Sequence, residues 1–196
     1  NNILKYYKII KSLESDNKFF LKERLTDIND LKFCFSYLFR KKKFFTKYKK
    51  YENFDLSKII INEIDLNRDL FSIFLSLYNY CFIKKLKKNS LKFSTVINWF
   101  ENQSMDKSWN FSFRKFFPGI KTIGYQGFTH YPEYMNTIPT YCEYKSKIIP
   151  EKIVVLNKNY KNLRKEFCKK LNIASGPALR SNDLFNSKKN VKKKFN

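Results

Sequence analysis

Glycine and proline are absent from the first 117 residues of this 196-residue chain. All four glycines and all five prolines lie between residues 118 and 177. Because these residues are the strongest local turn signals, their absence predicts a first half that is mainly helical. We expect helices over residues 3–13, 18–25, 31–50 and 63–88.

Histidine and paired cysteines are also scarce. The one histidine, His130, has no G-x-S-x-G serine to pair with, so the sequence does not indicate a catalytic triad. The four cysteines form no C-x-x-C pair, which argues against a zinc site or a redox motif and predicts buried free thiols. We expect no metal and no cofactor.

Arginine is scarce in a strongly basic chain, with six arginines beside 34 lysines and a formal net charge of +23. Such a charge is typical of nucleic-acid binders, but base readout and bidentate phosphate contacts favour arginine. Lys, Asn, Ile, Phe and Tyr are all abundant and all have A/T-rich codons, so genome composition accounts for much of the charge. We therefore expect a solvated lysine surface rather than a nucleic-acid partner, and a nucleic-acid-binding protein stays as an alternative.

No apolar run is long enough to span a membrane. The longest, residues 70–83, is shorter than the roughly 18–20 residues that a spanning helix needs, and its apolar residues follow helical spacing. A lysine cluster at residues 84–88 follows it. These cations can complement the helix dipole or contact a membrane surface, and both interpretations stay open.

From residue 92 onward, apolar runs of strand length alternate with helical segments, which favours parallel βαβ units. Ser104 is a candidate cap for a helix over residues 105–117, and Pro118-Gly119 is expected to end it. The other expected elements are strands at 93–100, 121–125, 152–156 and 171–175 and a helix at 159–170. We predict an α/β protein with a helical segment over residues 1–90, a Rossmann-like parallel sheet over 91–176, and a linker with a basic tail over 177–196.

A carboxylate and two amides follow the first expected strand, in the sequence Glu101-Asn102-Gln103. Open parallel sheets bind ligands outside the carboxyl ends of their strands, which is where these residues fall. A carboxylate there can act as a general base, worth roughly 10²–10⁴ in rate, or bind sugar hydroxyls. The alternatives for Glu101 are a helix cap and an ordinary surface acid.

The second expected strand ends in Gly124-Tyr125-Gln126-Gly127, which brings an aromatic ring and an amide to the same edge. Two glycines at a strand end are common in turns, so this motif is weak evidence for a ligand site. Glu143 can face the same cleft, and Arg180 can bind a phosphate or form an interdomain salt bridge. We expect His130 to be a loop residue.

Five motifs, taken in order, resemble a family of bacterial surface-carbohydrate biosynthesis proteins. They are W-F-E-N-Q (99–103), K-T-I-G-Y-Q-G-F (121–128), I-P-T-Y-C-E (138–143), I-P-E-K-I-V-V-L (149–156) and G-P-A-L-R (176–180). That family occurs with capsule and O-antigen (lipopolysaccharide) genes and resembles two-domain GT-B glycosyltransferases. The resemblance covers residues 93–180 and leaves the helical first half unmatched.

The resemblance implies that Glu101, Asn102 and Gln103 line an interdomain cleft, with Tyr125, Gln126 and Gly127 opposite. It also implies that residues 177–180 lead into a second, nucleotide-binding domain. Related glycosyltransferases often carry a histidine directly after the glutamine, where this chain has Gly127. A catalytic histidine is therefore not expected.

On this basis we expect a fragment of a glycosyltransferase that moves a sugar from a nucleotide-sugar donor to a bacterial surface polysaccharide. Glu101 is the candidate catalytic residue, and the candidate substrate-binding residues are Asn102, Gln103, Tyr125, Gln126, Gly127, Glu143 and Arg180. The chain begins without methionine, and we expect the fragment alone to be inactive. The expected location is cytoplasmic, with a peripheral position on the inner face of the cytoplasmic membrane as the alternative. A non-catalytic scaffold of polysaccharide assembly is a further alternative.

Overall fold

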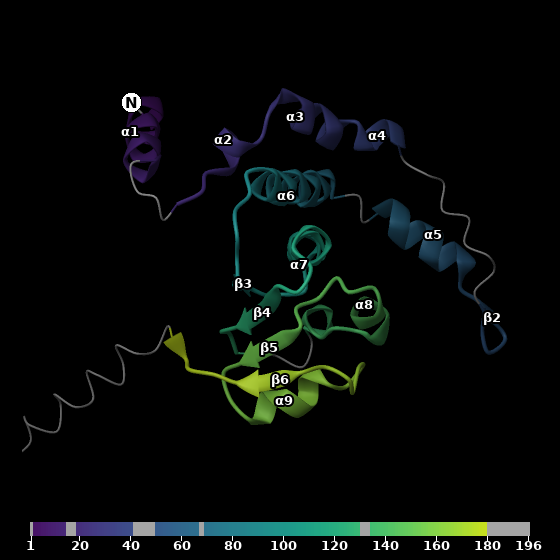
Figure 1. Ribbon diagram of the computed structural model, residues 1–196. Coiled ribbons are helices and arrows are strands. Elements are labelled where there is room, and N and C mark those ends of the chain that lie inside the picture. The colour runs from purple at the N-terminus through teal and green to yellow at the C-terminus, as the bar shows by residue number, and fades with distance from the viewer. Residues whose placement is uncertain (1, 15–18, 41–49, 67–68, 130–133, 180–196) are drawn as a thin grey trace, which may run out of the picture. The chain divides into compact units, whose positions relative to one another are not determined.

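A computed structural model describes residues 2–14, 19–40, 50–66, 69–129 and 134–179. The chain divides into two compact units, Asn1–Leu86 and Lys87–Asn196 (Figure 1). Each unit is described by itself. His130 and Arg180 lie outside the described residues, so the expectations for them stay predictions.

The first unit is mostly helical, with one short hairpin. Its elements are α1 (Asn2–Glu14), α2 (Lys22–Leu25), α3 (Ile28–Phe35), α4 (Tyr37–Arg40), β1 (Lys50–Tyr51), β2 (Phe54–Asp55), α5 (Ser57–Leu66) and α6 (Leu70–Lys88), the last of which runs two residues past the unit boundary. Sequence analysis missed the hairpin because its turn uses no glycine. Glu52 takes the left-handed conformation there, with φ of +52°.

Helix α1 covers the whole of the expected helix over 3–13, and the expected range 63–88 holds the end of α5 and all of α6. The other two expected helices differ from the prediction. The expected helix over 18–25 covers only α2, and the one over 31–50 is interrupted at Ser36 between α3 and α4. Asp27 caps α3 by accepting hydrogen bonds from the backbone N–H groups of Asn29 and Asp30. Its other oxygen accepts from Lys85 of α6 over 2.5 Å, which ties the start of α3 to α6.

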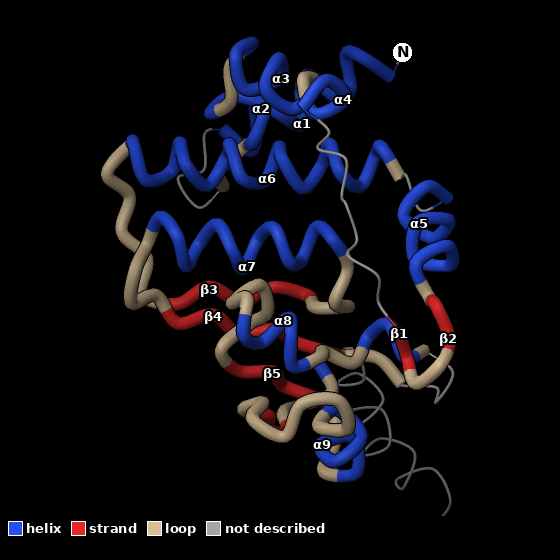
Figure 2. The backbone as a smooth tube through the Cα atoms, turned by 90° about the vertical axis from the view of Figure 1, so that its right-hand side faces the viewer, coloured by secondary structure: helices blue, strands red, loops and turns tan. Residues whose placement is uncertain are grey.

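The second unit contains a four-stranded parallel sheet with strand order β3-β4-β5-β6. Its elements are β3 (Thr95–Trp99), α7 (Ser104–Phe116), β4 (Lys121–Gln126), the 3₁₀ turn η1 (Met135–Thr137), α8 (Tyr141–Lys145), β5 (Lys152–Val155), α9 (Asn159–Arg164) and β6 (Ile173–Ser175). Helix α7 runs beside β3 and β4 (Figure 2), and α9 lies beside β6 (Figure 1). The predicted mixed α/β architecture with a parallel sheet is confirmed.

The start and end of α7 show what the local sequence determines. Ser104 is the first helical residue rather than the cap that we expected, because Asp106 provides the capping interaction. The Asp106 carboxylate accepts hydrogen bonds from the backbone N–H groups of Glu101 (2.8 Å) and Gln103 (3.2 Å). The helix ends at Phe116, and Gly119 follows with φ of +86°, a conformation that glycine adopts at little cost.

The two faces of the sheet differ in burial. One face carries Thr122, Gly124 and Gln126 of β4, all buried, and the buried side chains of β5 belong to the same face. Beside it lies the core of the second unit, which consists of Phe100, Ile149, Ile153, Val155, Cys168 and Leu171. The other face carries Ile97, which is 67% exposed, together with half-buried Trp99 and Tyr125. The alternation has the period of two that every β-strand imposes.

Candidate functional site at the carboxyl edge of the sheet

The register of β3 and β4 brings the predicted site residues together. Trp99 pairs with Tyr125 in the parallel ladder, and the backbone N–H of Phe100 donates to the Tyr125 carbonyl over 3.0 Å. Glu101 therefore follows β3 at the same edge at which β4 ends with Tyr125 and Gln126. This is the carboxyl edge of the sheet, where parallel sheets ordinarily bind ligands.

The Glu101 carboxylate is held by two side chains and caps no helix. Its Oε1 accepts from the Trp99 indole Nε1 over 2.6 Å, and its Oε2 accepts from the Gln103 amide over 2.9 Å. The helix-cap alternative for Glu101 is wrong, because the Asp106 carboxylate fills that role. Since a carboxylate offers about four lone-pair sites and two are used here, half-buried Glu101 can still accept a proton or a hydroxyl hydrogen bond.

Aromatic rings lie directly beside this carboxylate. The Trp99 ring meets Tyr125 edge to face, with centroids 5.7 Å apart, and contacts Phe128 at 5.9 Å. Gly127 completes the surface, because a Cβ at this position would come within 2.3 Å of the Tyr125 ring. Gly124 lies within β4 and neither glycine has a positive φ, so both are required by close packing rather than by a left-handed turn.

The Tyr125 hydroxyl holds the segment that follows β6. It donates to the carbonyl of Pro177 over 2.7 Å and accepts from the backbone N–H of Leu179 over 3.3 Å. The ring remains half-buried at the sheet edge, whereas the hydroxyl is occupied within the protein. A ligand contact by Tyr125 would therefore use the ring face.

Gln126 is buried on the face of β4 opposite to Tyr125, behind the candidate site. It is 1% exposed, its amide N donates to the Thr137 carbonyl (3.1 Å), and its Oε1 accepts from Arg164 Nε (2.5 Å). Arg164 also donates to Thr137 Oγ1 over 3.1 Å and lies 5.8 Å from the centroid of the Phe128 ring. Burial lowers the pKa of the Arg164 guanidinium to about 10, which leaves it protonated at neutral pH. The expectation that Gln126 contacts substrate does not fit a side chain whose two polar ends are used inside the protein.

Asn102 connects the first strand with the segment before β5. It adopts φ of +61°, a left-handed conformation that asparagine tolerates better than most residues, and is 6% exposed. Its amide donates to the carbonyl of Asn136 (3.0 Å) and more weakly to the Glu143 carboxylate (3.3 and 3.4 Å). Its Oδ1 is buried and accepts no hydrogen bond from the part of the chain that the structure describes.

Glu143 lies at the same edge, as predicted, but its oxygens are engaged within the protein. Lys107 of α7 forms an ion pair with it at 2.6 Å, and the backbone N–H of Thr140 donates to it over 2.7 Å, which caps α8. Partial burial would raise the pKa of Glu143, but the hydrogen bonds and charge of Lys107 and the bonds from Thr140 outweigh it and lower the pKa. Glu143 thus holds α7, α8 and Asn102 together.

The geometry adds three residues that the sequence reasoning did not assign to the site. Trp99 was part of the W-F-E-N-Q motif, and its position two residues before Glu101 on one strand face is a usable signal. Arg164 could have been singled out as one of six arginines in a lysine-rich chain. Lys107 carries no sequence signal, because it is one lysine among 34.

The described residues of both units hold no group of three or more His, Cys, Asp or Glu side chains that could bind a metal ion. None of the helices in the described ranges combines the length and apolar character needed to cross a membrane. Comparisons with protein-family models, with curated proteins and with solved structures gave no match.

Proposed function

We propose that this chain forms one wall of the catalytic cleft of a GT-B-like glycosyltransferase with a Rossmann-like sheet, which builds a bacterial surface polysaccharide from a nucleotide sugar. The observation that carries the proposal is the Glu101 carboxylate, held between Trp99 and Gln103 at the carboxyl edge of a parallel sheet. The ordered motifs that resemble surface-carbohydrate proteins support it, because two of them, 99–103 and 121–128, meet at this edge.

In this proposal Glu101 is the general base for the acceptor sugar. It takes the proton of an acceptor hydroxyl as that oxygen bonds to the anomeric carbon of the donor sugar, and the nucleotide leaves with the electron pair of the broken bond. The Trp99 and Tyr125 rings provide flat apolar faces on which the C–H face of a sugar can pack, and Gln103 can bind its hydroxyls. The donor nucleotide and the acceptor glycan are the proposed partners, and the proposed location is the cytoplasmic face of the inner membrane.

The test is Glu101→Gln in the intact gene product. Transfer of labelled sugar from a panel of nucleotide sugars to the membrane glycans of the source cells provides the assay. Because the substitution keeps the shape and an oxygen for Trp99 but removes the proton acceptor, we expect kcat to fall by about 10² or more with the melting temperature retained. Glu166→Gln, at an exposed glutamate after α9, is the matched control and should keep full activity.

Three results would contradict the proposal. An unchanged kcat with a higher KM would assign Glu101 to sugar binding. Absence of sugar transfer by the intact protein, together with normal glycan production in a Glu101→Gln strain, would favour a non-catalytic scaffold. Binding of nucleic acid without binding of any sugar nucleotide would favour the alternative of a nucleic-acid-binding protein, which the net charge suggests.

A further inference from the structure

The second unit contains a basic pocket at the amino edge of its sheet, away from the candidate site. Its cavity volume is about 290 Å³. It is lined by the end of α7, the segment between α8 and β5, and the residues that directly precede β6. Because the strands are parallel, the starts of β5 and β6 lie at the edge opposite Glu101.

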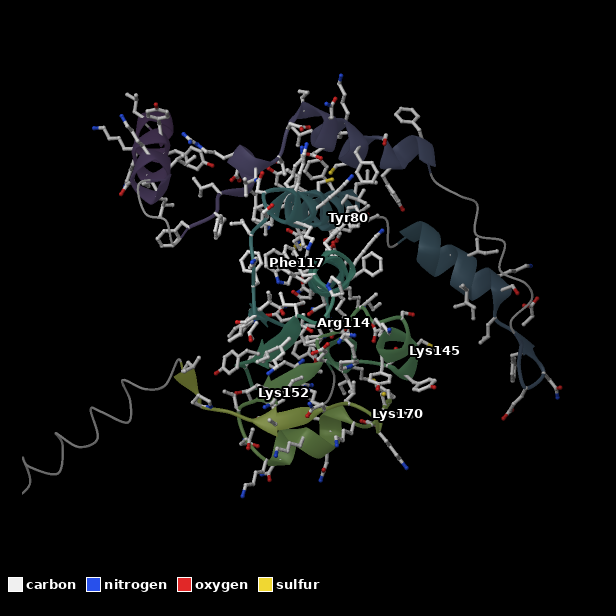
Figure 3. The ribbon with its side chains drawn as sticks, in the orientation of Figure 1. Tyr80, Arg114, Phe117, Lys145, Lys152 and Lys170 are labelled. Atoms are coloured by element: carbon white, nitrogen blue, oxygen red, sulfur yellow. The ribbon has the colours of Figure 1, made fainter. Side chains whose placement is uncertain are left out.

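We propose that this pocket binds a phosphate group carried on a small organic molecule, with Arg114, Lys145 and Lys147 as its cationic ligands. The inference stands on its own, since the pocket shares no residue with the proposed catalytic edge. Figure 3 labels Arg114 on α7 and Lys145 on α8, the two helices that bring these cations to the pocket.

The proposal rests mainly on the unpartnered guanidinium nitrogen of Arg114. Its Nε is fully buried and has no hydrogen-bond partner, and no carboxylate among the described residues forms an ion pair with its guanidinium. Burial lowers the pKa of Arg114, and the charge of Glu151 and, where it ionises, that of Tyr144 offset this in part. A partly desolvated cation is costly unless an anion compensates it, and arginine does not escape the cost by deprotonation. A bound anion would supply the missing partner.

The rest of the lining fits a phosphorylated organic molecule. Lys145 and Lys147 are exposed, and with Arg114 they place three cations around one carboxylate, that of Glu151. A guanidinium binds phosphate through two parallel hydrogen bonds, and the lysine ammonium groups add point charge. Ile153 and Leu171 form an apolar wall that can accept the organic part of the ligand.

The experiment is isothermal titration of the purified chain with phenyl phosphate, and with inorganic phosphate for comparison. We expect saturable one-to-one binding of phenyl phosphate, tighter than that of inorganic phosphate because of the apolar wall. Arg114→Gln should weaken the affinity about ten-fold or more, since it removes the bidentate contact. The double variant Lys145→Gln/Lys147→Gln should weaken it about ten-fold, and because both lysines are exposed it is expected to fold normally.

Lys152→Gln is the matched control. Lys152 lies between two pocket residues in sequence, Glu151 and Ile153, so its side chain points to the other face of the strand (Figure 3). Like Arg114→Gln, it removes one positive charge from the same edge, and it should change the affinity less than about two-fold. An equal loss in Lys152→Gln and in Arg114→Gln would overturn the site in favour of diffuse charge, as would unchanged affinity in the double lysine variant.

A second arm identifies the source of the phosphate. Sedimentation with phosphatidylcholine vesicles, with and without phosphatidic acid, is measured for the same variants. Phosphatidic-acid binding that is lost in Arg114→Gln and kept in Lys152→Gln would assign a lipid headgroup, and binding of phenyl phosphate alone would assign a free metabolite. Absence of saturable binding in both arms would overturn the proposal and leave the proposed glycosyltransferase function untouched.

Discussion

The Trp99 indole donates a hydrogen bond to the Glu101 carboxylate over 2.6 Å, from the last residue of β3 to the second residue beyond it. Both side chains are half-buried, which strengthens a hydrogen bond to a charged acceptor. The bond fixes one oxygen of the carboxylate while the Gln103 amide fixes the other.

Trp99→Phe should therefore lower the free energy of unfolding by about 1.5 kcal/mol, since it removes a hydrogen bond to a charged group but keeps an aromatic ring beside Tyr125. Urea denaturation of Trp99→Phe, Glu101→Ala and the double variant measures the interaction, because each single change removes the hydrogen bond. We expect a coupling energy of about 1 kcal/mol between the two positions. Strictly additive effects would mean that the indole and the carboxylate do not interact in solution.

The contribution of the Asn102 backbone conformation to stability can be measured separately from the contribution of its side chain. Asn102→Gly keeps access to φ of +61° and loses the amide bonds, whereas Asn102→Ala loses both. Because a left-handed conformation costs an alanine about 1 kcal/mol, Asn102→Ala should be less stable than Asn102→Gly by about that amount. Thermal denaturation of the two variants is the measurement, and equal stability would exclude backbone strain at this position.

The Glu143 carboxylate should make the free energy of unfolding depend on pH. Its pKa is lowered from the ordinary value of 4.5, so its contribution is fully present above about pH 4.5 and is lost as the pH falls through the lower folded value. Glu143→Gln should cost about 2 kcal/mol at pH 7, and this cost should shrink toward zero below the folded pKa. Urea denaturation of both proteins between pH 7 and pH 3 tests this, and a difference that does not depend on pH would contradict an ionised Glu143–Lys107 pair.

Gly124 is constrained by space rather than by backbone conformation. A Cβ at this position would lie 2.5 Å from Pro150 Cγ and 2.8 Å from Phe100 Cβ. Gly124→Ala should destabilise the protein by about 2 kcal/mol, because the added methyl group overpacks a buried face. Full stability of Gly124→Ala would mean that Pro150 and the Phe100 ring can move apart freely.

The cysteines should differ strongly in reactivity. Cys142 is exposed, whereas Cys34, Cys81 and Cys168 are buried free thiols, so the expectation of buried thiols holds for three of the four. Burial raises the pKa of Cys81 to about 12, so little thiolate is available at pH 8. A chromogenic disulfide reagent should titrate one thiol rapidly in the native protein and four after denaturation. Cys142→Ser should abolish the rapid phase, and a rapid phase that persists would place a buried cysteine at the surface.

The sequence was sufficient to predict the sheet edge, because apolar runs, their spacing and the polar residues after them are local features. The period of two in a strand also indicates that Tyr125 and Gln126 point to opposite faces of the sheet, so the sequence alone excludes that both face the same ligand. The ion pair of Glu143 with Lys107 could not be predicted in this way, because it depends on how α7 and α8 pack. The hairpin at residues 50–55 was missed because its turn uses Glu52 and Asn53 in place of glycine.

The contacts around Glu101 and Tyr125 differ in how much of the chain they require, which has a consequence for biosynthesis. The hydrogen-bond partners of Glu101 all lie between Trp99 and Asp106, and β3 pairs with β4, so the surroundings of the carboxylate require the chain no further than Gln126. The Tyr125 hydroxyl must wait for Pro177 and Leu179, which are synthesised more than fifty residues later. The first strand can thus acquire its local geometry early, and the edge is completed only when the last described segment is translated.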